Sequence, residues 1–244
     1  MHSLIRTFAI TIRVLRQISH DRRTVALMLV VPSLLTGLFA WMLDSSNQFD
    51  TIGPRLVGLF PFTVMFLLAS ITTLKERQSG TLERFFTMPM RRGEFIIGYA
   101  LAFGLMATVQ ASGTLWFAVQ VCGLTTDAST GDLVIAAIAN AILGMALGLL
   151  ASAFARSEFQ VIQFMPAFIF PQIILGGLFI PVESMPDMLQ TVSEWLPLTH
   201  SLRALSDIAA NATSSEIYIE IWTVLCVSVA ALLLGSLTLR RKTN

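Results

Sequence analysis

Charged side chains are scarce in this sequence of 244 residues. Only 13% of the residues are charged and 55% are hydrophobic, with a mean hydropathy of +0.73. Soluble domains carry about 25% charged residues, so this chain cannot cover itself with a hydrated surface. The composition therefore excludes a soluble protein and predicts an integral membrane protein. The net charge of +1 gives no indication of a nucleic-acid partner, and we expect none.

Residues that bind metals or carry out catalysis are also few. The two cysteines, Cys122 and Cys226, are not at metal-ligand or redox-motif spacing, and the three histidines are scattered. A membrane enzyme needs His, Asp or Glu clustered at one interface, whereas Glu76, Glu83 and Glu94 are interleaved with arginines. We therefore expect no metal site and no catalytic residue, and predict that the chain is not an enzyme.

The sequence lacks a phosphate-binding loop of the form G-x-x-x-x-G-K-[ST]. Its longest segment outside the apolar runs, residues 181–216, is too short for a nucleotide-binding domain, which needs on the order of 100 residues or more. If the function consumes ATP, we expect a separate ATPase chain to bind ATP and Mg²⁺, and this chain to bind no cofactor.

Six apolar runs are long enough to cross a bilayer, which takes about 20 residues per helix. They are Thr24–Leu43, Leu56–Leu74, Phe95–Cys122, Leu133–Phe154, Phe159–Ile180 and Ile217–Leu239. The sequence therefore predicts an all-α integral membrane protein with six transmembrane helices in a single domain, residues 1–244.

The distribution of Lys and Arg predicts the orientation of these helices. All but two of the 16 Lys and Arg residues lie at the chain ends or in the loops after the second and fourth spans. The exceptions are Arg55 and Arg203. Because cytoplasmic loops are enriched in Lys and Arg, we expect both termini and residues 75–94 in the cytoplasm of a cell with the chain in its plasma (inner) membrane.

Two flanking segments have helical periodicity of their own. In residues 1–23, Leu4, Phe8 and Ile12 recur at helical spacing, which predicts an interfacial helix in contact with membrane lipids. The alternative is a disordered, arginine-rich leader. In residues 181–209, apolar residues around Met188 and around Leu205 predict two short external helices that re-enter or lie on the outer leaflet.

The polar residues inside the spans are mostly uncharged, and the clearest charged residue is Glu220, near the outer interface. We expect interhelical hydrogen bonds from the buried polar set, which is Gln110, Ser112, Asn140, Gln160, Gln163 and Gln172. Ion-coupled carriers place charged groups near the midplane, so a secondary carrier or channel is a weaker alternative. Gly144 and Gly148 in the fourth span allow another helix to approach closely.

The fifth span combines two prolines, Pro166 and Pro171, with large apolar side chains. Proline removes a backbone donor and bends a helix, so this span is a candidate moving wall of a substrate pathway. The candidate pathway residues are Phe164, Met165, Phe168 and Gln172. The alternative is that these side chains face lipid or pack against other helices.

Residues 75–94 form a charged island between two apolar runs. Gly80, Pro89 and Gly93 interrupt regular structure, and between them Leu82, Phe85 and Phe86 share one face of a short helix. Such a face predicts a docking element at the membrane surface. The alternative is that the two phenylalanines anchor the island in lipid headgroups.

Residues 74–98 resemble the cytoplasmic signature of ABC type-2 transporter permeases. The elements that match are Glu76-Arg77, Gly80-Thr81-Leu82-Glu83, Pro89, Arg91-Arg92, Glu94 and Gly98. A second match is the run from Leu175 to Pro181, followed by Met185-Pro186, Trp195-Leu-Pro197 and a short helix around Leu202–Ile208. The six-span plan and the chain length are also similar.

This resemblance implies two permease copies, as a homodimer or heterodimer, and two ABC ATPase subunits beneath them. The residues it implies for ATPase coupling are Glu76, Arg77, Gly80, Thr81, Leu82, Glu83, Phe85, Phe86, Pro89 and Arg91. The compact form with GTLERFFTMP most resembles permeases of multidrug and antibiotic exporters. It implies outward transport of amphipathic, hydrophobic molecules, with glycan or lipid export as the alternative.

Overall fold

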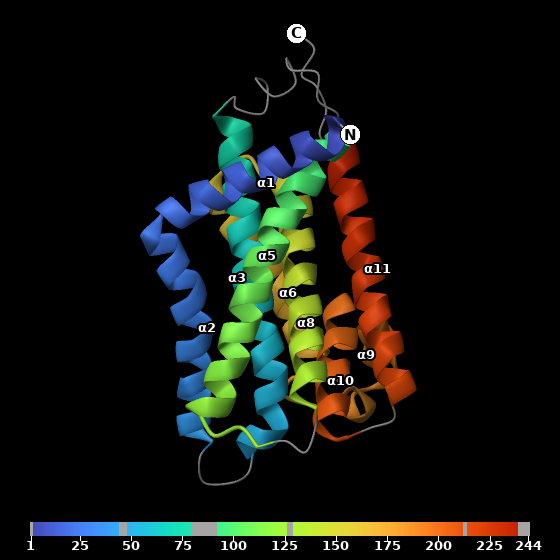
Figure 1. Ribbon diagram of the computed structural model, residues 1–244. Helices are drawn as coiled ribbons and strands as arrows, with labels where there is room; N and C mark the ends of the chain where they lie inside the picture. Colours follow the sequence, from blue (N-terminus) through green and yellow to red (C-terminus); the bar gives the residue numbers. More distant parts are fainter. Residues whose placement is uncertain (1, 44–47, 80–91, 126–128, 212–213, 239–244) are drawn as a thin grey trace.

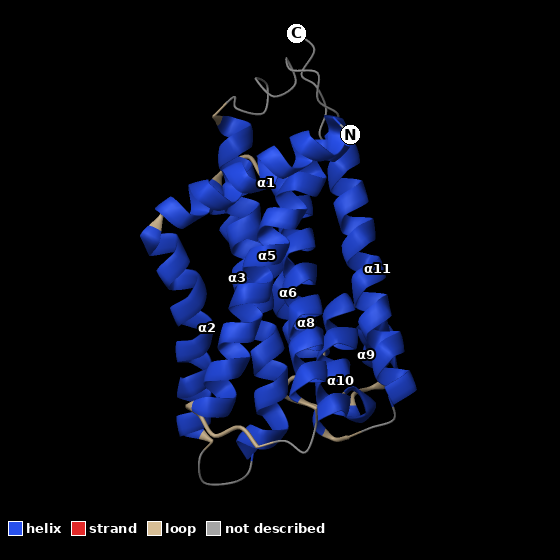
Figure 2. Ribbon diagram, viewed as in Figure 1, coloured by secondary structure: helices blue, strands red, loops and turns tan. Residues whose placement is uncertain are grey.

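The computed structural model describes residues 2–43, 48–79, 92–125, 129–211 and 214–238 (Figure 1). Within these ranges the chain is helical and contains no strand (Figure 2). Six helical segments are long and apolar enough to span a membrane, which confirms the predicted all-α, six-span architecture. They are α2 (Arg22–Met42), α3 (Gln48–Gln78), α5 (Arg92–Gln120), α6 (Thr130–Ser152), the composite segment α7–η1–α8 (Glu158–Leu175) and α11 (Ser214–Thr238).

Shorter helices cover the two ends of this bundle. Figure 1 shows α1 (His2–His20) lying across one end, which we call the α1 end. At the opposite end, α9 (Asp187–Glu194) and α10 (Pro197–Ala209) lie between α8 and α11, preceded by the single turn η2 (Val182–Ser184). We call this the α10 end. The two helices predicted in residues 181–209 are therefore present, and their insertion into a leaflet stays a prediction.

Helix α1 has two apolar faces. Ile10, Val14 and Ile18 are buried against the bundle, whereas Leu4 and Phe8 are exposed on the outside. The predicted helix is therefore present in place of a disordered leader. Its exposed apolar side chains are those that the periodicity predicts to contact lipid, and that contact stays a prediction.

The core of the bundle is the contact between α3 and α6. A Cβ atom added to Gly144 would lie 2.1 Å from the Phe62 carbonyl oxygen, and one added to Gly148 would lie 2.4 Å from that of Phe66. No side chain fits at such distances, so the two backbones touch because these positions are glycine. This confirms the predicted close approach of another helix to the fourth span.

One predicted interhelical hydrogen bond has a clear backbone cause. Pro32 in α2 has no N–H, so the carbonyl of Met28 one turn earlier loses its helical partner. The side-chain amide of Gln110 on α5 donates to this carbonyl at 2.9 Å. A buried carbonyl inside a membrane otherwise stays unsatisfied, so Gln110 offsets the cost of the proline.

The same prediction was wrong for other members of the polar set. Gln160 and Gln172 bond within their own segment, to the Arg156 backbone N–H and to the Phe168 carbonyl. Asn140 is fully buried, and neither polar atom of its amide has a hydrogen-bond partner among the described residues. Gly58 and the apolar side chain of Leu205 lie beside it, and neither has a polar side-chain group.

The fifth spanning segment differs from the predicted Phe159–Ile180 in length and in regularity. Its last helix, α8 (Phe170–Leu175), ends five residues early because Gly177 has a φ of +83°, a left-handed conformation that stops the helix. Within the segment, the π turn η1 (Met165–Ile169) lies between α7 (Glu158–Phe164) and α8, close to Pro166 and Pro171. The predicted bend is therefore an irregular turn, a feature often found at functional sites.

Candidate functional sites at the two ends of the bundle

A buried ion pair joins α1 to α3 at the α1 end. Glu76, near the end of α3, is only 5% exposed. Arg13 Nη2 donates to both of its carboxylate oxygens, at 3.3 and 3.4 Å. A carboxylate so deeply buried requires a cation, so this pair fixes α1 against the last turn of α3.

Gly98 explains how α1 crosses α5. A Cβ atom at Gly98 would lie 2.7 Å from Ile10 Cγ2, and the Thr11 hydroxyl donates to the Gly98 carbonyl at 3.1 Å. Only a residue without a side chain allows this contact. The glycine that matched the signature at position 98 is therefore the point at which α1 packs on the bundle.

Further bonds join the end of α3 to the region after α6. Arg77 donates to the carbonyl of Ser152, the last residue of α6, and Gln78 Nε2 donates to the Arg156 carbonyl at 2.7 Å. Glu76 and Arg77 therefore make contacts within the chain. Their predicted role in ATPase coupling stays a prediction.

The remaining predicted coupling residues lie outside the described part of the chain. They are Gly80, Thr81, Leu82, Glu83, Phe85, Phe86, Pro89 and Arg91. The described helices that flank them, α3 up to Gln78 and α5 from Arg92, both reach the α1 end. The described first and last residues of the island therefore lie at the α1 end, where Glu76 pairs with Arg13.

Three of the four candidate pathway residues line one apolar pocket of about 370 Å³. Phe164, Phe168 and Gln172 face α6 and Phe66 of α3 across it, and the rings of Phe164 and Phe168 meet edge to face at 5.7 Å. The Gln172 amide nitrogen donates to the Phe168 carbonyl at 3.1 Å, and its buried oxygen has no partner among the described residues. Met165 instead packs against the main apolar core.

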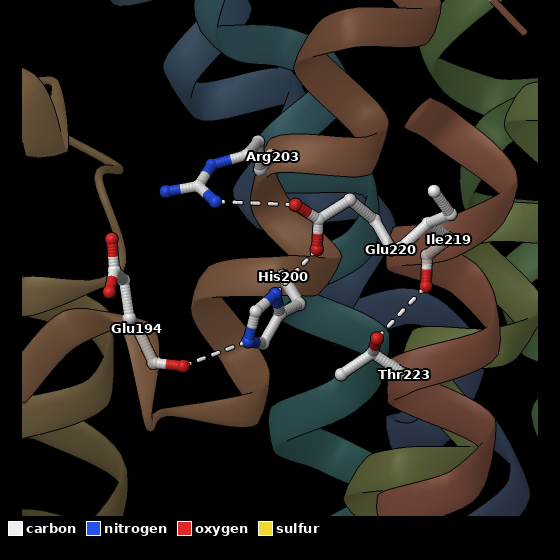
Figure 3. Close-up of polar contacts among 6 residues, drawn as sticks. All are labelled: Glu194, His200, Arg203, Ile219, Glu220 and Thr223. Atoms are coloured by element: carbon white, nitrogen blue, oxygen red, sulfur yellow. Dashed lines mark hydrogen bonds and ion pairs between the residues drawn. The ribbon is translucent and has the colours of Figure 1, made fainter. Parts of the chain in front are cut away.

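At the α10 end, Glu220 of α11 holds two cationic side chains of α10 (Figure 3). Its Oε1 accepts from Arg203 Nη1 at 3.2 Å, and its Oε2 lies 2.5 Å from His200 Nδ1. The other ring nitrogen, His200 Nε2, lies 2.9 Å from the backbone carbonyl of Glu194. This cluster ties α9, α10 and α11 together.

The geometry assigns a charge to His200. A carboxylate and a carbonyl only accept hydrogen bonds, so both ring nitrogens must carry a proton and the ring is an imidazolium. The hydrogen bond to Glu220 is the main cause that raises the pKa of His200 above its usual value, and burial opposes it. The His200–Glu220–Arg203 cluster is thus an ion cluster with one titratable cation.

Arg55 of α3 forms a second set of hydrogen bonds between elements at this end. It donates to the Gly177 carbonyl at 2.9 Å, just after α8, and to the Ser206 hydroxyl of α10. A cavity of about 140 Å³ beside it is also lined by Glu183 and Asp207, and burial raises the pKa of Asp207. In the sequence, Arg55 and Arg203 stand out only as exceptions to the charge bias. The signal for their role was that they lie in segments at the same end as many carboxylates, among them Glu183 and Asp207.

The architecture and these two ends define a multi-pass membrane permease. The sequence model of the family "ABC-2 type transporter" matches residues 6–209, so the chain belongs to this family. This confirms the resemblance found in the signature residues, and the family implies a partnership with an ABC ATPase subunit.

Similar proteins include several transporter permeases. The chain is 27% identical over 189 residues to ABC transporter G family member 20 of Dictyostelium discoideum, covering 78% of the chain and 26% of the relative. It is 26% identical over 179 residues to the probable multidrug ABC transporter permease YbhR of Escherichia coli, covering 72% and 48%. For the linearmycin resistance permease LnrN of Bacillus subtilis the identity is 22%, covering 75% and 47%. The chain therefore matches between a quarter and a half of the length of these relatives.

Proposed function

We propose that the chain is the membrane subunit of an ATP-driven exporter whose ATPase subunits dock at the α1 end. The observation that supports this proposal is the packing of α1 on α3 and α5, the two helices that flank the coupling residues in sequence. Arg13, Glu76 and Gly98 hold the helices that flank residues 80–91 in fixed positions. Motion of a docked ATPase can then be transmitted to α3, which packs on α6 in the core.

In this proposal the α1 end faces the cytoplasm of a cell that carries the chain in its inner membrane. The bias of Lys and Arg toward this end supports that orientation. Glu76 and Arg77 secure the base of the island, and the apolar face with Leu82, Phe85 and Phe86 contacts the ATPase. Two permease copies, identical or different, and two ATPase subunits form the complex.

The proposed substrates are amphipathic, hydrophobic molecules that leave the cell. The names of YbhR and LnrN, a probable multidrug permease and a linearmycin resistance permease, support this class. The apolar pocket lined by Phe164, Phe168 and Gln172 also suits it, because apolar walls with one polar group are typical of small-molecule sites. Its position beside the irregular turn η1 makes it a candidate part of the pathway.

Co-purification of the chain with its ATPase tests the docking assignment. Replacing both Phe85 and Phe86 with Asp is expected to abolish the association, because two carboxylates cannot enter an apolar groove, while the chain still inserts in the membrane. The control variant Ser79→Asp adds charge within the island but outside its apolar face, and is expected to keep most of the association. Normal ATPase binding by the double variant would contradict the proposal.

A further inference from the structure

A groove of about 560 Å³ lies between α2 and α3, next to Asp21, the residue that joins α1 to α2. Its wall on α3 is one helix face that extends from Val64 through Ile71 to Lys75, and its wall on α2 includes Leu27 and Val31. We call it the α2–α3 groove. Its volume is in the range of sites that hold a drug-sized molecule.

The polar groups of this groove are gathered at one end. Asp21, Lys75 and Glu158 lie at the α1 end, and the wall toward Val64 is apolar. Val64 and Lys75 are about 16 Å apart along α3, at roughly 1.5 Å per residue. That is about half of a bilayer core of about 30 Å. The groove is therefore about as long as one leaflet is deep, with a charged mouth and an apolar interior.

The residues that line the mouth carry a net negative charge, and Arg23, outside this lining, acts on Asp21 as a nearby cation. The Asp21 carboxylate accepts from the Thr24 backbone N–H at 3.2 Å and from the Thr24 hydroxyl at 2.5 Å, and these bonds lower the pKa of Asp21. Lys75 Nζ lies 3.6 Å from Glu158 Oε1. Two carboxylates face one ammonium group, so the charge that complements this mouth is positive.

A second groove shows that this charge is not a general property of the lipid-facing surface. The groove between α5, α6 and α11 has a larger volume, about 640 Å³, and none of the described residues that line it is charged. Its walls include Leu101, Val229 and Leu233. Such a surface suits the uncharged tails of lipids, whereas the α2–α3 groove also offers a site for a charged head.

We propose that the α2–α3 groove binds a cationic amphiphile, a molecule with an ammonium head and an apolar body, from the leaflet at the α1 end. The head lies between Asp21 and Glu158, and the body lies against Leu27 and Ile71. A phospholipid is a poorer occupant because its phosphate meets the negative mouth. This inference rests on the proposed export function, for which it names a substrate class and an entry site.

Binding of radiolabelled tetradecyltrimethylammonium tests the site on the full chain in phosphatidylcholine nanodiscs. We expect saturable binding above partition into empty nanodiscs, and little competition from tetradecyl sulfate, which has the same tail and the opposite charge. The double variant Asp21→Asn/Glu158→Gln is expected to weaken binding about tenfold or more, since it removes both carboxylates. The variant Asp132→Asn, which removes a carboxylate at the α10 end, serves as the charge control.

A matched pair of bulky substitutions tests the position of the site. Leu27 and Leu233 are 62% and 60% exposed and line the charged and the uncharged groove respectively. Leu27→Trp is expected to block saturable binding, and Leu233→Trp to leave it unchanged. Both exposed positions tolerate the larger side chain without repacking the core.

Three results would overturn the inference. They are unchanged binding by the carboxylate variant, equal competition by the sulfate, and displacement of the probe by phosphatidylethanolamine at equal concentration, which would identify a lipid site.

The binding assay needs no ATPase, so it is separate from the test of export. If cells export the probe equally with the wild-type chain and the carboxylate variant, the groove assignment fails and the export function stands. Saturable, carboxylate-dependent binding without ATP-dependent export would support the groove as a binding site and contradict the proposed export function.

Discussion

Each end of the bundle holds a glutamate that is largely shielded from solvent, Glu76 at 5% and Glu220 at 14% exposure, but the two are neutralised in different ways. At the α1 end, both oxygens of Glu76 accept from the guanidinium of Arg13, a type of side chain that carries a permanent charge in proteins. At the α10 end, the oxygens of Glu220 are shared between Arg203 and the imidazolium of His200. The comparison shows one end held by a permanent charge and the other held in part by a titratable one.

The difference matches what each end has to do in the proposed exporter. The α1 end must keep its shape while an ATPase docks and leaves, so a pH-independent pair is suited to it. The α10 end closes the bundle with short helices that must separate for a substrate to leave. An ion cluster with a titratable member makes that separation easier at high pH than at low pH.

Removing Arg13 is expected to have the largest effect. Arg13→Met leaves the Glu76 carboxylate buried without this cation, which we expect to cost roughly 3 kcal/mol of stability and to free α1 from α3. Thermal unfolding of the purified protein in detergent measures the loss, with the exposed Arg16→Met as control. The double variant with Glu76→Gln should recover part of it, and a double variant no more stable than Arg13→Met would contradict the ion-pair account.

Gly98 tests the same end through packing alone. Gly98→Val places side-chain atoms where Ile10 lies, so α1 must move, at a cost of about 2 kcal/mol. Gly104→Ala on the same helix is the control, because nothing lies within 4 Å of its added Cβ and the change should be neutral or slightly stabilising. Protease sensitivity of α1 reports the displacement. Equal sensitivity of both variants would show that α1 does not pack at Gly98.

The spans and the glycine contacts could be predicted because their signals are local. Length and hydropathy define six runs, and Gly144 and Gly148 lie one turn apart on one helix face. The end of the fifth span was missed because Leu178, Phe179 and Ile180 continue the apolar run after Gly177 has ended the helix. Hydropathy measures transfer into lipid and contains no information on φ.

The ion clusters also could not be predicted from residue patterns, but the reason differs from that for the end of the fifth span. Arg13 and Glu76 are far apart in sequence and meet because α1 crosses the bundle, a geometry that depends on Gly98. His200 and Glu220 come from separate helices joined through a loop. Such pairs depend on tertiary packing, which periodicity within one segment does not encode. The sequence did point to Glu220 as the clearest charged residue within a span.

Raising the pH should loosen the α10 end and leave the α1 end unchanged. The pKa of His200 is raised in the folded protein, so its stabilisation is complete below the unfolded-state value of about 6.5 and is lost as the pH rises through the folded value. Because the ring is only partly buried, the loss should be about 1 kcal/mol or less. Unfolding temperature against pH measures it.

The variant His200→Gln is the control for this pH effect. Glutamine can still donate one hydrogen bond to Glu220 but does not titrate, so its stability should be nearly independent of pH between about 6 and 9. The Arg13→Met variant, by contrast, should retain the pH dependence of the wild type because it alters the other end. Identical pH profiles for the wild type and His200→Gln would refute the assignment of the titrating group.

The smallest effect is expected for an ion pair at the α1 end that water can reach. Lys75 and Glu158 lie 3.6 Å apart with side chains 59% and 50% exposed, so solvent screens their attraction. Lys75→Ala should therefore change stability by less than about 0.5 kcal/mol, although the residue is next to Glu76 in sequence. Thermal unfolding in low and high salt checks this. If the loss approached that of Arg13→Met, burial of the carboxylate would not be what separates the Arg13–Glu76 pair from the Lys75–Glu158 pair.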